Sequence, residues 1–397
     1  MSIENSLLQR IETRIVLPEW AERVVSPAYD VLRPLERDRL MDQDPYVFLH
    51  VTSSKSDETE VAKTNANFDA LKRLYEVGAY SAKAEPSLYL YKLKQNQHEQ
   101  IAIVGDVSLE IFESGGIVPH ERTRQNRTDD LANHLKEIGI HSSPVALAYD
   151  DDEAVKSLIS VVIESPPILD FCREDNLEQT IWRIPDVTSE RLISLFDNKD
   201  TFIIDGHHRM SASREIWERS GKANRYSRVL AAFFAVGDLK IEAFHRHVID
   251  LNGLTPEMLT SQIAANDFLI TPLDSSQSPE PLTSGYFSMC LDGHWARLQP
   301  LRVHPSEFDT AILQNRILGP ILNVDEQGSD RRLQYLPGTV GLSHLESLTL
   351  GEEGVAFALH PVNMKQLLSV VKKNKTLPPK STYFEPKVRS GIFITER

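Results

Sequence analysis

A run of five residues, Asp205-Gly206-His207-His208-Arg209, carries the strongest chemical signal in the sequence. It follows an apolar stretch at 201–204 that predicts a buried strand, and a helical pattern over 208–219 comes after it. A helix N-terminus presents N–H groups and about half a positive charge, so it favours an anion. Gly206 allows the backbone to approach a ligand closely, and Arg209 can donate two hydrogen bonds to a phosphate. We therefore predict a phosphate site at this turn, with Asp205 either holding Mg²⁺ or orienting a histidine.

The simpler interpretation of the same run is a helix cap followed by a surface histidine pair. Two adjacent histidines between Asp-Gly and Arg, at a strand-to-helix junction, favour the phosphate site instead. Other well-known motifs are absent from the sequence. It contains no P-loop, no G-x-G-x-x-G after a strand, no G-x-S-x-G and no H-E-x-x-H.

Three further clusters could take part in chemistry. The loop 119–123 offers a base, a cation and hydrogen-bonding groups, although its side chains could equally be solvated. His245 and His247 share one face of a predicted strand, so a metal pair is conceivable, but no nearby carboxylate or cysteine completes a ligand set. Lys380 and Lys387, in the tail, could reach an anion or simply be solvated.

Charge and length limit the class of protein. The 397 residues are 41% hydrophobic and 25% charged, as in globular proteins, and the chain is long enough for two domains. We place a soft boundary near residue 250, which gives domains at 1–250 and 251–397. The net charge of −14 repels a nucleic-acid backbone, so no nucleic-acid partner is expected.

The sequence also bears on location and redox state. Its start is acidic, which is not typical of a signal peptide, and no stretch approaches the roughly 18 apolar residues that span a bilayer. We therefore expect a cytoplasmic protein with no membrane partner. Cys172 and Cys290 have no C-x-x-C spacing, so a zinc knuckle is not indicated, whereas a disulfide stays open.

Short apolar strands alternate with helical patterns, which predicts an α/β (mixed α+β) fold. The expected elements include a helix over 57–78 with Phe68, Leu71 and Tyr75 on its inner stripe, a strand over 101–112, a helix over 188–196 capped by Thr188, a central strand over 229–236, a helix that starts at Thr255-Pro256, and a hairpin over 286–298 that turns at Asp292-Gly293. On the helix over 208–219, Ala212, Ile216 and Trp217 are expected to face inward.

Taken in order, these clusters resemble a widespread bacterial and archaeal family of once-uncharacterised proteins with a D-G-H-H-R signature. The resemblance covers nearly the whole chain. Its motifs here are Ser26-Pro27-Ala28-Tyr29-Asp30-Val31, Asp44-Pro45-Tyr46, Pro119-His120-Glu121-Arg122-Thr123, Asp205 to Arg209, His245-Arg246, Pro379-Lys380-Ser381-Thr382-Tyr383-Phe384 and Pro386-Lys387.

The resemblance implies a fold and an activity. The D-G-x-H-R turn is similar to the phosphate-binding turn of the ParB/sulfiredoxin fold, which implies a ParB/sulfiredoxin-like nucleotide-binding core with a C-terminal α/β elaboration. His207 stands where sulfiredoxin has its reactive cysteine, and the acidic charge disfavours a DNA-partition role. The free-serine kinase branch remains. Ala28 and Gln314 depart from the family pattern, and Gln314 bears on acceptor specificity.

We therefore expect a small-molecule kinase that transfers a phosphoryl group from ATP or ADP to a hydroxyl of L-serine or a similar metabolite. Glu121 is the expected base, with Asp30 as substitute; Asp205 and Asp30 are the expected Mg²⁺ ligands, and Asp205 and His207 complete the catalytic set. The expected nucleotide-binding residues are Gly206, His207, His208, Arg209, His120, Arg122, Arg246 and Lys380. Two alternatives stay open, a phosphoester hydrolase and a nucleotide sensor without turnover. The oligomeric state is also open, with a homodimer as one option.

Overall fold

The computed structural model describes residues 6–29, 32, 34–53, 60–173, 175–197, 199–302, 307–325, 330–351, 354–373, 377–378 and 380–397. They form a mixed α/β structure with two compact units. The first unit comprises 1–119, 123–239 and 386–397, and the second comprises 120–122 and 240–385. Residues 240–250 thus group with the second unit; the division into domains at residue 250 stays a prediction.

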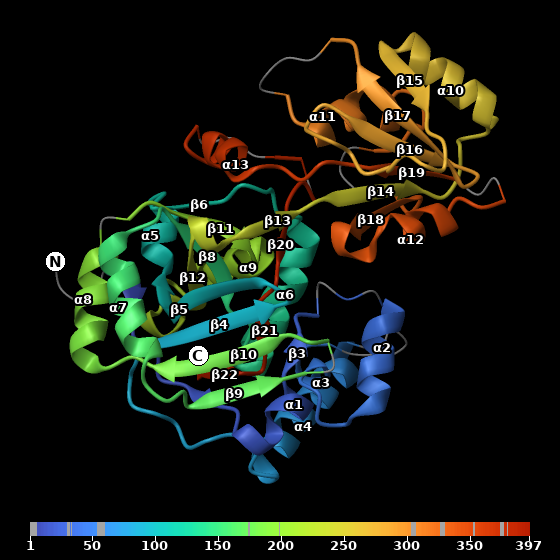
Figure 1. Ribbon diagram of the computed structural model, residues 1–397. Helices are drawn as coiled ribbons and strands as arrows, with labels where there is room; N and C mark the ends of the chain where they lie inside the picture. The colour runs from blue at the N-terminus through green and yellow to red at the C-terminus, as the bar shows by residue number, and fades with distance from the viewer. Residues whose placement is uncertain are drawn as a thin grey trace. The chain divides into compact units, whose positions relative to one another are not determined.

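The first unit is built on a nine-stranded sheet (Figure 1). The strands of this unit are β1 (Leu8–Gln9), β2 (Arg14–Ile15), β3 (Ser26–Pro27), β4 (Tyr89–Gln95), β5 (His98–Ser108), β6 (Ile117–Val118), β7 (Ile140–His141), β8 (Val145–Tyr149), β9 (Leu169–Cys172), β10 (Glu178–Arg183), β11 (Thr201–Asp205), β12 (Arg228–Ala235), β21 (Arg389–Ser390) and β22 (Phe393–Glu396). The large sheet has the order β6-β11-β8-β12-β5-β4-β10-β9, with β1 beside β5. Two smaller sheets, β2-β22-β7 and β21-β3, bring the last strands of the chain into this unit.

Strand β12 confirms the predicted central strand. It lies between β5 and β8, antiparallel to the first and parallel to the second. All side chains from Val229 to Phe234 are buried. Such a continuous apolar run is expected where both faces of a strand are covered, because neither face has to meet water.

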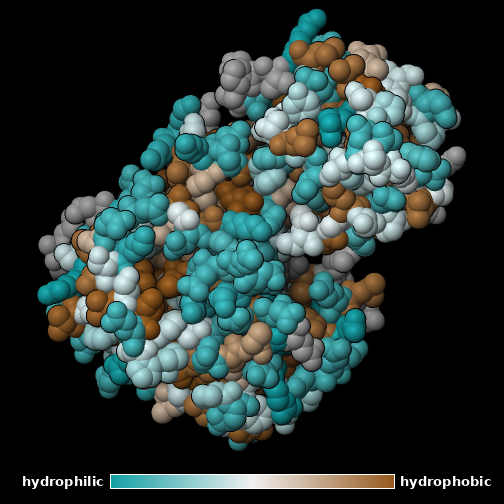
Figure 2. Space-filling model, viewed as in Figure 1, coloured by the Kyte–Doolittle hydropathy of each residue, from teal (hydrophilic) through white to brown (hydrophobic). Residues whose placement is uncertain are grey.

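The helices of the first unit are α1 (Pro18–Val24), α2 (Pro34–Gln43), α3 (Leu49–Thr52), α4 (Glu60–Glu76), α5 (Leu109–Glu113), α6 (Gln125–Ile138), α7 (Glu153–Ile163), α8 (Asp186–Phe196) and α9 (His207–Arg219). Helices α7 and α8 pack side by side (Figure 1) and bury Val155 and Phe196 in the main core. Much of the visible surface is hydrophilic, with apolar side chains gathered over α7 and α8 (Figure 2). Val161 and Val187 are each 66% exposed there.

Three local predictions were wrong. On helix α4 the predicted inner stripe is right for Leu71, which is buried with Asn67 and Leu74, but wrong for Phe68 (54% exposed) and Tyr75 (37% exposed). The Asn67 amide donates 2.7 Å hydrogen bonds to the carbonyls of His50 and Ser53 and so fixes the inner face of the helix. The predicted strand over 101–112 ends at Ser108, where α5 begins. Helix α8 begins at Asp186 with Pro185 at the N-cap position, and Thr188 lies inside it.

The second unit is built on a six-stranded antiparallel sheet of order β15-β17-β16-β19-β14-β18. The strands of this unit are β13 (Lys240–Glu242), β14 (Phe244–Val248), β15 (Phe268–Pro272), β16 (Phe287–Leu291), β17 (His294–Pro300), β18 (Leu333–Pro337), β19 (Val355–Ala358) and β20 (Tyr383–Glu385). Its helices are α10 (Pro256–Ala265), α11 (Asp309–Leu313), the π-helix η4 (Gln314–Leu318), α12 (Leu342–Ser347) and α13 (Met364–Val371).

Turn and cap chemistry in this unit agrees with the sequence. Thr255 caps α10 by accepting a hydrogen bond from the Met258 N–H. The β16–β17 hairpin turns at Asp292 and Gly293, whose φ angles are 45° and 74°, as the primed hairpin turns require. Gln314, the departure from the family pattern, opens the π-helix and donates a 3.0 Å hydrogen bond to the Val324 carbonyl.

Both cysteines are free thiols: Cys172 is exposed and Cys290 is buried. The disulfide that the sequence left open is therefore not formed. No helix in the described part of the chain has both the length and the apolar character needed to cross a bilayer.

Glycine 354 gives a test of the second unit. Its φ is +80°, and a Cβ there would lie 2.1 Å from the Val248 carbonyl oxygen. Gly354→Ala should therefore lower the free energy of unfolding by about 3–5 kcal/mol. Gly253 has a similar φ of +76° but open space around its Cα, so Gly253→Ala should cost only about 1–2 kcal/mol. Urea unfolding followed by circular dichroism measures both, and equal losses would contradict the predicted clash.

Candidate functional site

The predicted strand, turn and helix at 201–219 are present. Strand β11 ends at Asp205, and α9 begins at His207. Between them Gly206 has φ 92° and ψ 26°, and no side chain caps the helix. Side chains rarely adopt this left-handed conformation, and a Cβ on Gly206 would also lie 3.1 Å from Cζ of Arg209. Both reasons favour glycine at this turn.

Inward packing of α9 also agrees with the sequence. Ala212, Ile216 and Trp217 are all buried. Ala212 and Ile216 form a cluster with Leu131 and Ala132 of α6, so the two helices are packed against each other. The middle of α9 is thereby held against α6.

The carboxylate of Asp205 binds two cations of the same unit. One oxygen accepts a 2.5 Å hydrogen bond from Nη2 of Arg209, and the other contacts Nζ of Lys387. The three side chains are between 7% and 17% exposed, so water screens these ion pairs weakly. From the sequence, Lys387 was predicted only as one of two tail lysines, because no local pattern pairs it with a residue 182 positions away.

Arg209 also holds the loop before β8. Its Nη1 donates hydrogen bonds to the carbonyl oxygens of Ser143, at 3.1 Å, and Pro144, at 2.5 Å. Arg209 is 6% exposed, and each of its two Nη atoms has a protein partner. In this arrangement Arg209 is a positioning residue for the turn. Its direct donation to a phosphate stays a prediction and would require an exchange of partners.

The two histidines occupy the first turn of α9. His207 is 9% exposed, and Nδ1 of His208 lies 3.5 Å from Oγ1 of Thr128 on α6. Both side chains therefore stay close to the turn instead of forming a surface pair in solvent.

The second unit holds another group of predicted residues. His120 is buried, and its Nε2 lies 3.0 Å from Oγ1 of Thr382. Arg246 is also buried: its guanidinium lies 4.5 Å from the Tyr335 ring centroid, and Nη2 donates a 3.0 Å hydrogen bond to the Lys380 carbonyl. Burial lowers the pKa of Arg246 to about 10, against the opposing charges of Tyr335 and Glu121. Glu121 thus acts electrostatically on Arg246.

The predicted residues fall into two groups. The first unit brings together Asp205, Gly206, His207, His208 and Arg209, and adds Lys387. The second unit contains His120, Glu121, Arg122, Arg246 and Lys380. Arg122 is exposed, and the Lys380 ammonium lies 5.5 Å from the Phe244 ring centroid. Asp30, the substitute base and predicted Mg²⁺ ligand, lies outside the described residues.

Metal binding has little support from the side chains. Within the described ranges, no group of three or more His, Cys, Asp or Glu residues could hold an ion. Both oxygens of Asp205 are already bound to cations, so this carboxylate does not fit a Mg²⁺ ligand in its present arrangement. The His245–His247 pair also has little support as a metal site. Nδ1 of His245 accepts a 3.2 Å hydrogen bond from the Leu359 N–H, so this nitrogen is not available to a metal ion.

The triad of Lys387, Asp205 and Arg209 gives a second prediction. Asp205→Asn removes the charge that two buried cations share, so it should lower the free energy of unfolding by about 3–5 kcal/mol. Asp130→Asn, at an exposed position on α6, should change it by less than about 0.5 kcal/mol. Lys387→Met should lose much less stability in the Asp205→Asn background than in the wild type; additive losses in urea unfolding would show that the pair is not coupled.

Burial of His245 predicts a pH dependence. Burial, followed by the charge of Arg246, lowers the pKa of His245 from 6.5 to about 4. Between pH 6.5 and about pH 4, His245 therefore binds a proton in the unfolded chain but not in the folded chain. The resulting stability is fully present above pH 6.5 and is lost as the pH falls toward 4, by up to about 3 kcal/mol.

His245→Asn keeps an acceptor for the Leu359 N–H and removes the titration. This variant should lose less stability than the wild type when urea unfolding is compared at pH 7.5 and pH 5. His294→Asn changes an exposed histidine and should keep the wild-type slope. Identical slopes in wild type and His245→Asn would refute the assignment.

Comparison with known proteins adds family membership. No curated protein matches the sequence. Similar solved structures include a conserved hypothetical protein from Pyrococcus furiosus. It is 13% identical over 74% of this chain and 95% of that protein, with a TM-score of 0.38. Free serine kinase in complex with AMP is 14% identical over 74% of this chain and 91% of the kinase, with a TM-score of 0.40. SbnI with C-terminal truncation from Staphylococcus aureus is 12% identical over 72% of this chain and 84% of SbnI, with a TM-score of 0.37.

TM-scores this low do not establish a shared fold. The sequence itself matches a family over most of its length. Residues 11–321 match the family described as "Protein of unknown function (DUF1015)". The chain therefore belongs to the DUF1015 family.

Proposed function

We propose that this chain is a small-molecule kinase that transfers a phosphoryl group from a nucleotide, ATP or ADP, to the hydroxyl of a free amino acid such as L-serine or of a similar metabolite. The proposal includes a ParB/sulfiredoxin-like core in the first unit, with the D-G-H-H-R run as its phosphate-binding signature. The observation that carries it is the turn between β11 and α9.

Three properties of this turn suit a phosphate. The left-handed Gly206 is the N-cap of a 13-residue helix, and no side chain caps the N–H groups of the first turn. The helix dipole places partial positive charge there. Lys387 and Arg209 add two cations beside it, both tied to Asp205. A phosphate oxygen could therefore accept hydrogen bonds from the helix start while it shares these cations with Asp205.

In the proposed reaction, the acceptor hydroxyl oxygen forms a bond to the terminal phosphorus of the nucleotide. The bond from that phosphorus to its bridging oxygen breaks, and the hydroxyl proton passes to the carboxylate of Glu121. Lys380 is the better candidate for neutralising the transferred charge, because Arg246 is buried and donates to the carbonyls of Phe244 and Lys380. Both oxygens of Asp205 contact cations in this structure, so no step is assigned to Mg²⁺.

The proposal predicts a new phosphomonoester. Purified full-length chain is incubated with Mg²⁺, ATP or ADP, and pooled hydroxy amino acids and polyols, and phosphorus NMR follows the products. A new phosphomonoester resonance is expected, and dividing the pool then identifies the acceptor. Release of inorganic phosphate alone would favour a hydrolase, and unchanged nucleotide would favour a sensor.

Glu121→Gln tests the proposed base. This variant should lose turnover by roughly 10²–10⁴-fold and still bind nucleotide, because general-base catalysis contributes about that factor. Glu280→Gln, a matched change at an exposed position, should keep wild-type turnover. Wild-type turnover in Glu121→Gln would remove Glu121 from this role.

A further inference from the structure

Helix α7 has more apolar side chains than the core of the first unit uses. Seven of its eleven residues are apolar, but only Val155 and Val162 are fully buried. Leu158 and Ile159 are half-buried against the main core, and Val161 is 66% exposed. A helix whose apolar side chains extend well beyond its inner stripe is typically covered on that flank by another element. The outer flank of α7 is therefore a candidate interaction surface.

Further exposed apolar side chains lie at the same end of the α7 and α8 pair. Val187, in the first turn of α8, is 66% exposed, and Ile168 is 44% exposed. The two helix ends are held together, because Nε1 of Trp182, just before α8, donates a 2.9 Å hydrogen bond to the Ser165 carbonyl, just after α7. Figure 2 shows apolar side chains gathered over this helix pair. We call the following side chains the α7–α8 surface: Val161, Ile163, Ile168 and Val187.

Acidic residues surround the α7–α8 surface. Residues 150–170 and 183–200, which contain it, include ten Asp or Glu and four Lys or Arg, so they carry −6 of the net charge of −14. Glu164 follows α7 directly, and Asp186 precedes Val187 directly; both acidic residues are exposed. An exposed apolar patch with a polar rim is typical of a protein interaction site. Here the rim is predominantly negative.

The negative rim selects among possible partners. A second copy that used the same surface would bring two rims of like charge together, which is unfavourable, and an anionic lipid surface is disfavoured for the same reason. A partner with apolar side chains flanked by Lys and Arg gains apolar burial and opposite charge together. A helix suits this partner, because it would continue the layer that α7 and α8 form and would present anchors at i, i+3, i+4 and i+7.

We propose that the α7–α8 surface binds a basic amphipathic helix of a partner protein. The apolar face of that helix covers Val161 and Val187, and its Lys and Arg side chains lie near Glu164 and Asp186. The surface belongs wholly to the first unit. The inference goes beyond the proposed kinase activity and does not depend on it.

The test uses the full-length chain and three fluorescein-labelled synthetic peptides of equal length. The first peptide has Leu on one helical face and Lys on the other; in the second Glu replaces Lys, and in the third Gln replaces Leu. Fluorescence anisotropy should show saturable binding of the Leu–Lys peptide and at least about tenfold weaker binding of the other two. Equal binding of the Leu–Lys and Gln–Lys peptides would show only general attraction to an acidic chain. That result, or no saturable binding of the Leu–Lys peptide, would overturn the proposal.

Variants assign the binding to this surface. Val161→Thr combined with Val187→Thr keeps the side-chain shape at two exposed positions, so the chain should fold. Its affinity for the Leu–Lys peptide should fall about tenfold, because less apolar area is covered. Val77→Thr, at a valine that is 36% exposed outside the surface, should bind the peptide as the wild type does. Unchanged affinity in the double variant would show that the peptide binds elsewhere.

Two further measurements test the other possible occupants. Sedimentation equilibrium without peptide tests a second copy, and flotation with phosphatidylglycerol vesicles tests an anionic lipid surface. The wild type and the double variant are expected to give the same mass and no vesicle binding. Self-association or vesicle binding that the double variant abolishes would show a different occupant of the α7–α8 surface and would refute the proposal.

Discussion

The carboxylate of Asp205 joins three segments of the first unit that are remote in sequence. It belongs to the last residue of β11, it holds Arg209 in the first turn of α9, and it holds Lys387 between β20 and β21. Through Arg209 the same network reaches the carbonyls before β8. Burying three charges is unfavourable unless their geometry is satisfied. The ion pairs therefore favour one conformation of the turn. In that conformation the backbone of Gly206 is left-handed.

This network changes the expected chemistry of the turn. The chain carries a net charge of −14, so an anionic ligand needs a local region of positive potential. Arg209 and Lys387 provide it, but each already shares the charge of Asp205. A bound phosphate would thus draw on the helix dipole and on cations whose first partner is a carboxylate. In this structure Asp205 positions both cations through its two oxygens.

Local patterns predicted the elements whose causes are local. The apolar run of β12, the strand–glycine–helix junction at Gly206 and the Asp292-Gly293 hairpin follow from burial and from backbone conformations that particular residues prefer. The inner face of α4 did not follow, because hydrogen bonds from Asn67 to the end of α3 override its apolar stripe. Lys387 was likewise missed as a partner of Asp205, since only the folded chain brings the two together.

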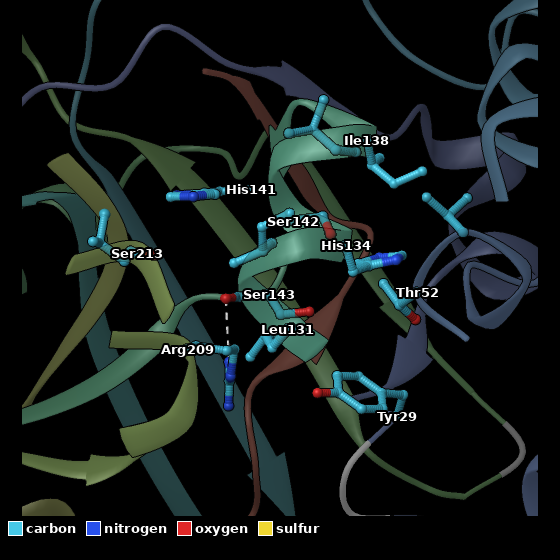
Figure 3. Close-up of a pocket in the computed structure, with 14 residues that line it drawn as sticks. Tyr29, Thr52, Leu131, His134, Ile138, His141, Ser142, Ser143, Arg209 and Ser213 are labelled. Atoms are coloured by element: carbon cyan, nitrogen blue, oxygen red, sulfur yellow. Dashed lines mark hydrogen bonds between the residues drawn. The ribbon is translucent and has the colours of Figure 1, made fainter. Parts of the chain in front are cut away.

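Helix α9 has two sides with different consequences for a ligand. Ala212 and Ile216 pack on Leu131 and Ala132, so α6 and α9 cannot approach further without repacking this cluster. A pocket lined by Leu131, Arg209 and Ser213, among others, lies beside that contact, and the same packing maintains it (Figure 3). Arg209 is one of the residues that line the pocket, and its Nη2 also donates to Asp205 at the turn. Because a guanidinium is planar and rigid, any movement of Arg209 at the pocket also moves the donors that hold Asp205 and the carbonyls before β8, so one side chain couples the pocket to the turn.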